Sequence, residues 1–322
     1  MNTTNIAKLS LKTRLLRVSH LLFALFLLTQ ILPQAMSKLR GKTDLPVADA
    51  PLYAIVFIAA VEVILIAVSL LARKKETLTL FCDIIAFVYI LFIAWTLATA
   101  KFNVIREQLF PPPGVVLRQF VEDASPLLGH IGASLLLIAR GFALALVTAI
   151  PLGLVFGSSA RFGSAAGMVS KFIGSIPPVV YIPYGIALLP TFKTVSAMVI
   201  FLASFWPIFG GTMSGVMLID RTIINSARAL GVGRVSMLFH VTLNAALPQI
   251  MLGASQALTV SFILLTSAEM IAARNGLGFY VKNYSDLGNY TKTIVGVIAI
   301  GIVISLVFLV FNRIQKFLLR WR

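Results

Sequence analysis

Cysteine and histidine are scarce in this sequence, and their scarcity excludes several kinds of site. Cys82 is the only cysteine among 322 residues, so a single chain can form neither an internal disulfide nor a cysteine metal cluster. The three histidines, His20, His130 and His240, lie 110 residues apart and lack the spacing of metal ligands. We therefore expect no metal site.

Charged residues are also few. They make up 12% of the chain, whereas soluble domains carry about a quarter. Hydrophobic residues account for 59%, and the mean hydropathy is +0.96. A hydrocarbon core about 30 Å thick takes roughly 20 helical residues to cross. We therefore predict an all-α polytopic membrane protein with about eight transmembrane helices, at residues 18–36, 52–72, 78–100, 131–157, 172–190, 195–218, 245–268 and 293–312.

The net charge of +16 lies at the ends of these apolar runs and forms no basic stripe that would indicate nucleic-acid binding. Lys and Arg accumulate on the cytoplasmic side of membrane proteins. With both termini inside, the cytoplasmic segments hold sixteen basic residues and the outer segments ten. We therefore predict that both termini are cytoplasmic. An alternative makes the first run a cleaved signal peptide that ends near residues 34–37, but the lengths of the run and of its basic region favour a retained anchor.

The polar loop between the sixth and seventh runs is the most informative segment. Asp220 is suited to cap a short helix from Arg221 to Leu230, about 15 Å long, and Gly231 is suited to the left-handed turn that ends it. A second apolar segment, Val235 to Leu243, follows, and Pro248 then opens the next span. We predict a helix, a turn and another helix lying at the membrane surface.

Two stretches of this loop carry a specific pattern. Asn225 to Gly231 reads Asn-Ser-Ala-Arg-Ala-Leu-Gly, and Phe239 to Pro248 reads Phe-His-Val-Thr-Leu-Asn-Ala-Ala-Leu-Pro. Their sequence and spacing resemble the cytoplasmic "EAA" signature of permease subunits of binding-protein-dependent ABC importers. Asn225 stands where that family has Glu, and Asn244 where it has the first Pro of its Leu-Pro-x-x-Leu-Pro run. Without the Glu, docking on an ATPase would rely on shape and apolar burial rather than on that charge.

Further segments resemble the nitrate, sulfonate, taurine and bicarbonate branch of the family, and the resemblance covers about residues 108–320. It implies a type I importer core of five helices preceded by three N-terminal helices. It also implies N-terminal helices at residues 1–105 and a permease domain at 106–322, with a coupling loop at 219–244. The segments that carry the resemblance are Phe110-Pro111-Pro112-Pro113 with Val116-Leu117, Ser134 to Gly141, Ile176-Pro177-Pro178 with Ile182-Pro183, and Ala268-Glu269-Met270-Ile271 with Gly276-Leu277-Gly278.

The resemblance implies the permease subunit of an ATP-driven importer in a bacterial inner membrane, for a small anion or polar nutrient such as nitrate, a sulfonate, taurine or bicarbonate. The short helix of the loop would dock on a separate ATPase and transmit its motion to the spans. The implied coupling residues are Asp220, Asn225, Ser226, Ala227, Arg228 and Gly231.

The chain shows no phosphate-binding loop of its own. Gly41-Lys42-Thr43 matches the end of such a loop, but Met36 stands where the earlier glycine is required. We therefore expect no enzymatic activity and no cofactor in this chain, with ATP and Mg²⁺ used by the partner ATPase.

The resemblance implies three protein partners besides the lipid bilayer. These are an ABC ATPase subunit, an extracytoplasmic solute-binding protein and a second copy of the permease, because five family-like spans make only half of a pathway. We expect the outer segments Phe110 to Ser125 and Arg274 to Asn289 to dock the binding protein, with plain connecting loops as the alternative.

Ionisable side chains inside the spans are candidates for the solute pathway, because charges are costly in hydrocarbon. Arg140 is suited either to stabilise an anionic solute or to form a structural ion pair with Glu269. Glu62 is expected to tie the N-terminal helices together or to stay protonated. Hydroxyl groups on the seventh run can line a cavity or hold helices together: Thr259, Ser261, Thr266 and Ser267.

Two other classes of function fit the sequence less well. A secondary transporter driven by an ion gradient normally shows inverted repeats and helices broken near the midplane, and the sequence shows no such pairing. A membrane enzyme needs His, Asp or Glu clustered at one membrane face, whereas these residues are scattered here.

Overall fold

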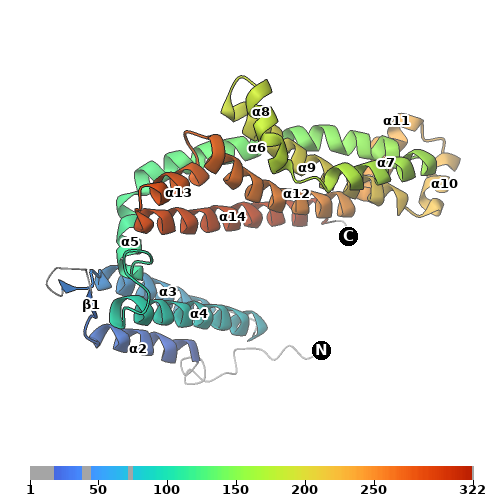
Figure 1. The fold of residues 1–322 in the computed structure, drawn as a ribbon. Helices are drawn as coiled ribbons and strands as arrows, with labels where there is room; N and C mark the ends of the chain where they lie inside the picture. The colour runs from blue at the N-terminus through green and yellow to red at the C-terminus, as the bar shows by residue number, and fades with distance from the viewer. Residues whose placement is uncertain (1–17, 38–44, 72–74, 321–322) are drawn as a thin grey trace. The chain divides into compact units, whose positions relative to one another are not determined.

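The computed structural model of the chain describes residues 18–37, 45–71 and 75–320. Contacts between residues divide the chain into two units, residues 1–124 with 284–295 and residues 125–283 with 296–322. Each unit is described by itself (Figure 1). The domain boundary near residue 105 that the sequence suggests stays a prediction.

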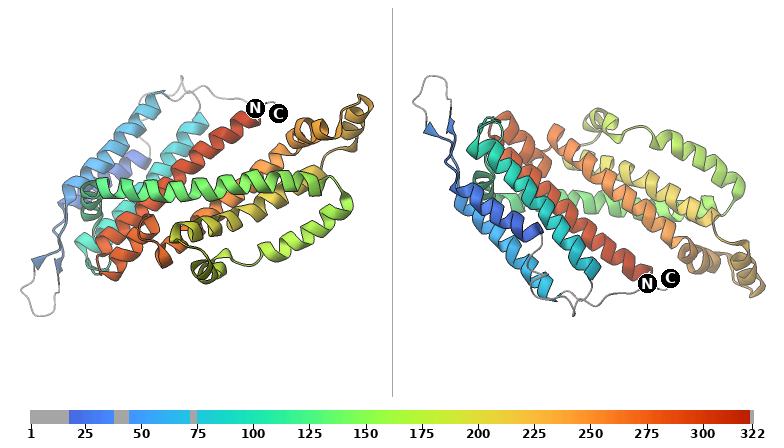
Figure 2. Two further views of the ribbon diagram at one scale, coloured as in Figure 1. Left: turned by 90° about the horizontal axis from the view of Figure 1, so that it is seen from above. Right: turned by 90° about the horizontal axis from the view of Figure 1, so that it is seen from below.

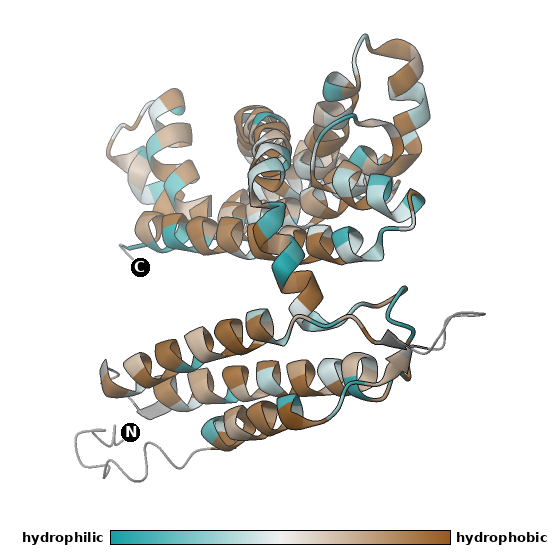
Figure 3. Ribbon diagram, turned by 90° about the vertical axis from the view of Figure 1, so that its left-hand side faces the viewer, coloured by the Kyte–Doolittle hydropathy of each residue, from teal (hydrophilic) through white to brown (hydrophobic). Residues whose placement is uncertain are grey.

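The first unit is built on three packed helices, α2, α3 and α4. Apolar residues predominate along all three, as the lower part of Figure 3 shows. A short antiparallel strand pair places Met36 opposite Pro46. The elements of this unit are α2 Val18–Ile31, β1 Met36–Ser37, β2 Leu45–Pro46, α3 Pro51–Leu71, α4 Lys75–Thr96, the π-helical turn η2 Leu97–Lys101 and α5 Pro113–Glu122.

A polar group lies within the apolar core of these three helices. Phe26 and Ile58 are fully buried in that core, and Glu62 is only 6% exposed. The Glu62 carboxylate accepts a hydrogen bond of 2.7 Å from the Tyr89 hydroxyl on α4 and contacts Nδ1 of His20 on α2. A buried carboxylate requires such partners. The prediction that Glu62 ties the N-terminal helices together is confirmed.

The second unit contains the remaining long helices, with α9 and α12 packed along each other (Figure 2). The last two helices, α13 and α14, also contribute residues 284–295 to the first unit. The elements are α6 Ala124–Gly157, α7 Ala160–Gly174, the 3₁₀ turn η3 Pro178–Tyr181, α8 Ile182–Leu188, α9 Phe192–Met217, α10 Arg221–Ala229, α11 Arg234–Ser236, the π-helical η4 Met237–Thr242, α12 Leu243–Ala272, α13 Leu277–Asp286 and α14 Tyr290–Leu318.

Small residues bring α9 and α12 together. A Cβ placed on Gly253 of α12 would lie 2.5 Å from the carbonyl oxygen of Pro207, and one on Gly211 of α9 would lie 3.0 Å from Gly253 Cα. Close approach through small residues is how helices associate where no hydrophobic driving force acts between them. The buried Ser204 and Ser261 hydroxyls hydrogen-bond across the same pair at 2.7 Å.

The all-α membrane fold is confirmed, but the count of eight spans is not. Six helices of the described chain are long and apolar enough to cross a membrane, or seven if one bent pair forms a single span. The described α2 has 14 residues, about 21 Å at 1.5 Å per residue, which is less than a hydrocarbon core of about 30 Å. The spans are Pro51–Leu70, Leu78–Lys101, Ala124–Gly157, Phe192–Met217, Arg234–Ile271 and Tyr290–Leu318.

The fifth apolar run differs from its prediction as one helix at residues 172–190. The structure has two helical segments there, Ala160–Gly174 and Pro178–Leu188, bent by 72° relative to each other. Pro177 and Pro178 explain the break, because proline lacks the N–H that would continue the helix and its ring clashes with the preceding turn.

Candidate functional site

Helix α10 is closed at both ends by local hydrogen bonds. The Asp220 carboxylate accepts a bond of 2.8 Å from the Thr222 amide, and this bond lowers the pKa of Asp220. At the other end Gly231 has a φ of +74°, and the Val232 amide donates to the Ala227 carbonyl at 3.1 Å. These bonds satisfy one amide in the first turn of the helix and one carbonyl in its last turn. The caps predicted at Asp220 and Gly231 are confirmed, and α10 is a short, stiff rod.

The loop carries α10 beyond the ends of α9 and α12, at one end of the second unit (Figure 1). Ala227, at 9% exposed, faces the protein. The remaining residues of the predicted coupling set are exposed: Asp220, Asn225, Ser226, Arg228 and Gly231.

Apolar side chains are exposed around α10. Ile223 is 48% exposed, Leu230 83% and Val235 72%. A cavity of about 660 Å³ adjoins the helix, with Arg228 and Phe239 in its lining. Exposed apolar surface of this kind, next to polar groups, is typical of a protein contact.

The segment after α10 differs from its prediction as a separate surface helix. Residues Arg234–Ile271 form one continuous helical stretch. Within it, the π-helical segment η4 leads directly into α12. Pro248 therefore lies inside α12 and does not open the span. Membrane helices tolerate an internal proline when neighbouring groups satisfy the freed backbone. The consequence is a direct mechanical link from the α10 turn into α12.

At the other end of α12, Glu269 is 1% exposed and lies within a closed hydrogen-bond cluster. Its carboxylate accepts hydrogen bonds from the Ser134 hydroxyl of α6 at 2.6 Å and from the Gly278 amide at 2.8 Å. The Leu277 amide donates to the same Ser134 oxygen at 2.9 Å. Gly276, with a φ of +119°, leaves the space that the carboxylate occupies. The cluster fixes the turn between α12 and α13.

The ion pair suggested between Arg140 and Glu269 is absent from the described residues. Arg140 is exposed on α6, whereas Glu269 satisfies its carboxylate with a hydroxyl and a backbone amide. Neutral donors therefore replace the expected cation. The hydroxyl groups suggested for the pathway on the seventh run have different surroundings. Thr259 is exposed and donates a hydrogen bond to the Ser255 carbonyl, while Ser261 is buried against α9.

A groove of about 590 Å³ lies between α7, α9 and α12. Its walls carry polar side chains from all three helices, among them Lys171, Trp206, Gln249 and Gln256. The described lining includes none of the residues that the sequence suggested for the pathway, which are Arg140, Thr259, Ser261 and Glu269.

Comparison with known proteins identifies the family. Residues 149–322, more than half of the chain, match the family described as "Binding-protein-dependent transport system inner membrane component". The chain belongs to this family. The resemblance to ABC import permeases and the interpretation of this chain as one of them are confirmed, and the permease works with an ATPase and a solute-binding protein as a multi-pass inner-membrane component.

Several known proteins are similar to this permease. The taurine transport system permease protein TauC of Escherichia coli (strain K12) is 30% identical over 234 residues, which cover 70% of this chain and 84% of TauC. The nitrate import permease protein NrtB of Leptolyngbya laminosa is 29% identical over 54% of this chain and 62% of its own. A chain of the inward-facing MetNI methionine ABC transporter has the same fold, with a TM-score of 0.52 and 17% identity over 61% of this chain and 97% of its own.

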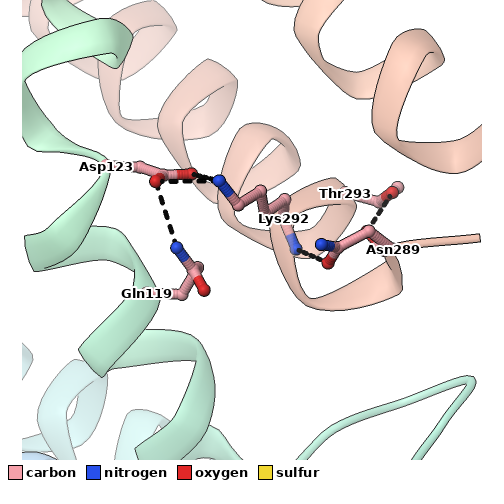
Figure 4. Close-up of polar contacts among 5 residues, drawn as sticks. All are labelled: Gln119, Asp123, Asn289, Lys292 and Thr293. Atoms are coloured by element: carbon pink, nitrogen blue, oxygen red, sulfur yellow. Dashed lines mark hydrogen bonds and ion pairs between the residues drawn. The ribbon is translucent and has the colours of Figure 1, made fainter. Parts of the chain in front are cut away.

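An ion pair ties the end of the first segment predicted to face outward to Lys292 at the start of α14, three residues after the second such segment (Figure 4). Lys292 in the first turn of α14 lies 3.1 Å from both carboxylate oxygens of Asp123, the residue that follows α5. Gln119 donates to the same carboxylate at 3.0 Å, and Asn289 caps α14 by accepting from the Lys292 amide at 3.1 Å. The Asp123 side chain is 9% exposed, so the pair is better shielded than an ordinary surface pair.

Sequence reasoning missed two residues of this permease. Ser134 lies 135 residues from Glu269, and no spacing rule predicts such a partner. Lys171 is one of the sixteen basic residues assigned to the cytoplasmic side, and its place in the groove follows only from the packing of α7 along α9. The run of small residues before Lys171, which favours close helix packing, was the available signal.

Proposed function

We propose that this permease forms, with a second copy of itself, the solute pathway of an ATP-driven importer, and that α10 couples the pathway to separate ATPase subunits. The observation that carries the proposal is the construction of α10. It is a short rod capped by Asp220 and Gly231, exposed at the end of the unit and joined directly to two packed spans.

A capped rod suits mechanical coupling because it moves as a rigid body. When an ATPase subunit closes on ATP, a helix held in its surface would move with it and pull on α9 and α12 together. The exposed apolar side chains Ile223, Leu230 and Val235 supply surface for such a contact. Asn225, in place of a carboxylate, offers an amide that donates and accepts hydrogen bonds.

The coupling role fixes the orientation, because the ATPase binds nucleotide in the cytoplasm. We propose that α10 and both termini are cytoplasmic, as the distribution of basic residues indicates. The chain itself would then be non-catalytic and without a cofactor, with ATP and Mg²⁺ bound by its partner. Homodimer formation would place one ATPase under each half of the pathway.

We propose that the solute is a small anion or polar nutrient, such as taurine, another sulfonate, nitrate or bicarbonate. The support is the similarity to the taurine permease TauC and the nitrate permease NrtB. The binding protein would deliver the solute to the outer segments Phe110 to Ser125 and Arg274 to Asn289. The Asp123–Lys292 pair supports that assignment, because it holds α5 against the start of α14.

The experiment replaces Gly231 with valine and measures ATP-driven uptake of taurine and nitrate after reconstitution with the ATPase and binding protein. A Cβ at Gly231 meets nothing within 4 Å, so the substitution acts only through the φ of +74°. A β-branched residue in that conformation costs about 1–2 kcal/mol. We expect uptake to fall about tenfold, as such an energy implies, while membrane insertion is retained.

Gly233→Val is the matched control. Gly233 also has open space around it, but its φ is −66°, which valine adopts without strain. We expect its uptake to stay near wild type. Equal uptake by the two valine variants would contradict a coupling role for the α10 turn.

A further inference from the structure

The groove between α7, α9 and α12 carries a lysine beside α9, a helix long and apolar enough to span a membrane. A Cβ on Gly167 of α7 would lie 3.1 Å from Met213 Cε, and one on Gly174 would lie 3.2 Å from Trp206 Cβ. Lys171, between these two glycines, therefore lies beside the second half of α9, between Trp206 and Met213. Met213 and Trp206 lie four and eleven residues before the end of α9 at Met217. At 1.5 Å per residue, Lys171 therefore lies roughly 6–16 Å from that end of the helix.

A lysine at that depth needs a reason, because intramembrane charges are costly and mark functional sites by default. Within the described residues Lys171 has no carboxylate within ion-pair distance, and no Asp or Glu lines the groove. Its ammonium is thus a positive charge without an internal counter-ion.

Neutral hydrogen-bond donors accompany this charge. Gln249 and Gln256 project from α12, with Gln256 near the middle of that helix, and Trp206 projects from α9. The described part of the chain gives none of these three side chains a hydrogen-bond partner. Gln256 is exposed, and Gln249 and Trp206 are half-buried, so their N–H groups are free to donate to a group that enters the groove.

Apolar residues complete the wall. Leu202 on α9 and Leu252 and Val260 on α12 line the same groove. Such surroundings lower the local dielectric constant and strengthen the attraction between an ammonium and an anion. One cation, several N–H donors and an apolar wall form the usual composition of a small-ligand site, and the volume of about 590 Å³ falls in the usual range.

We propose that this groove is a binding site for a small anion or sulfonate on its way through the permease. Lys171 supplies the charge, and Gln249, Gln256 and Trp206 supply hydrogen bonds to its oxygen atoms. The assignment deepens the proposed function and rests on it for the identity of the transported solute. Lys171, rather than Arg140, is then the cation that the solute meets.

Cysteine labelling tests the charge of the groove without transport. Ser175 lines the groove near Lys171, and Cys82 is the only native cysteine, so Ser175→Cys in a Cys82→Ser permease gives one reactive thiol there. The permease, in complex with its ATPase in nanodiscs, is labelled with the anionic 2-sulfonatoethyl and the cationic 2-trimethylammonioethyl methanethiosulfonates. We expect Lys171→Gln to lower the anionic-to-cationic rate ratio about tenfold, and Lys171→Arg to restore it.

Protection of the Ser175→Cys thiol from labelling tests whether a solute occupies the groove. Taurine and nitrate are expected to slow labelling by the anionic reagent in a saturable manner, and this protection is expected to disappear in Lys171→Gln. Lys316→Gln, on α14 outside the groove lining, is the control and should keep the ratio and the protection. A ratio unchanged by Lys171→Gln, or the absence of saturable protection by either anion, overturns the anion site.

Measurements of uptake distinguish a failure of this binding site from a failure of the proposed function. In proteoliposomes Lys171→Gln should raise the KM for taurine or nitrate at least about tenfold relative to Lys316→Gln, in line with the loss of one close charge. An unchanged KM also overturns the site. If the unmodified permease imports neither probe with ATP, the proposed solute class fails, and the labelling ratio and protection still decide the groove.

Discussion

At the scale of single residues, hydrogen bonds fix two turns of this permease: Asp220 caps α10 through its neighbour Thr222, and Glu269 is held by Ser134 of another helix. Asp220 and Gly231 could be assigned as caps because capping depends on neighbours a few positions away. The partner of Glu269 could not be assigned from the sequence, since Ser134 lies on another helix. Its charge suggested Arg140 as that partner, but hydrogen bonds from a hydroxyl group and a backbone amide satisfy a buried carboxylate equally well.

The cap at Asp220 predicts a residue-specific change in the stability of α10. Asp220→Ala removes the acceptor for the Thr222 amide, whereas Asp220→Asn keeps a side chain that caps equally well. We expect faster hydrogen exchange in the first turn of α10 for the alanine variant and near wild-type exchange for the asparagine variant.

The same cap should depend on pH. The hydrogen bond from Thr222 lowers the pKa of Asp220 below its ordinary value of 3.8. The cap therefore has its full strength above pH 3.8 and loses the contribution of the charge as the pH falls through the lower folded-state value. Hydrogen exchange measured down this range should show this weakening in wild type but not in Asp220→Asn; identical profiles would rule out a contribution of the Asp220 charge.

The Glu269 cluster predicts that Gly276 tolerates no side chain. In Gly276→Ala the new methyl group would overlap the Glu269 carboxylate, and the φ of +119° disfavours any L-residue. Gly288→Ala is the control, because Gly288 shares a positive φ of +70° but has open space around it. Strain alone costs about 1–2 kcal/mol, and overpacking adds about 1–3 kcal/mol. Thermal unfolding in nanodiscs should show the larger loss for Gly276→Ala, and equal losses would contradict the cluster.

At the scale of elements, hydropathy located the long helices but not their breaks and joins. The spans at Phe192–Met217 and Tyr290–Leu318 follow directly from apolar runs. The bend after Gly174 depends on a Pro-Pro pair, which could have been read from the sequence. The continuity of the helix through Pro248 could not be predicted from the sequence, because it depends on neighbouring helices that satisfy the freed backbone groups.

The contact between α9 and α12 predicts a strong position effect for glycine. Gly253→Val should destabilise the permease, because its side chain would meet the Pro207 carbonyl of α9. Gly301→Val on α14 adds the same atoms where nothing lies within 4 Å. We expect a loss of about 3 kcal/mol or of folded yield only for Gly253→Val, given the usual cost of overpacking. Thermal unfolding or the yield of monodisperse protein measures it, and a stable Gly253→Val permease would refute the close packing.

At the scale of the whole molecule, family membership could be predicted because the signature loop keeps its spacing despite Asn225 and Asn244. The N-terminal helices lie outside the matched residues 149–322, and the sequence indicated only that Glu62 could tie them together, without naming Tyr89 as its partner. The solute could not be predicted from spacing, because the polar residues of the groove come from three helices whose arrangement only the fold reveals.

The central claim is that α10 is the element through which an ATPase moves the permease, and cysteine crosslinking tests it most directly. Asn225→Cys in a Cys82→Ser permease places one thiol on the exposed face of α10. We predict a crosslink from this thiol to the ATPase subunit in membranes, with a yield that changes on ATP binding, and no labelling by an impermeant reagent added outside. The absence of any crosslink from positions along α10, or labelling of residue 225 from the external side, would contradict the account.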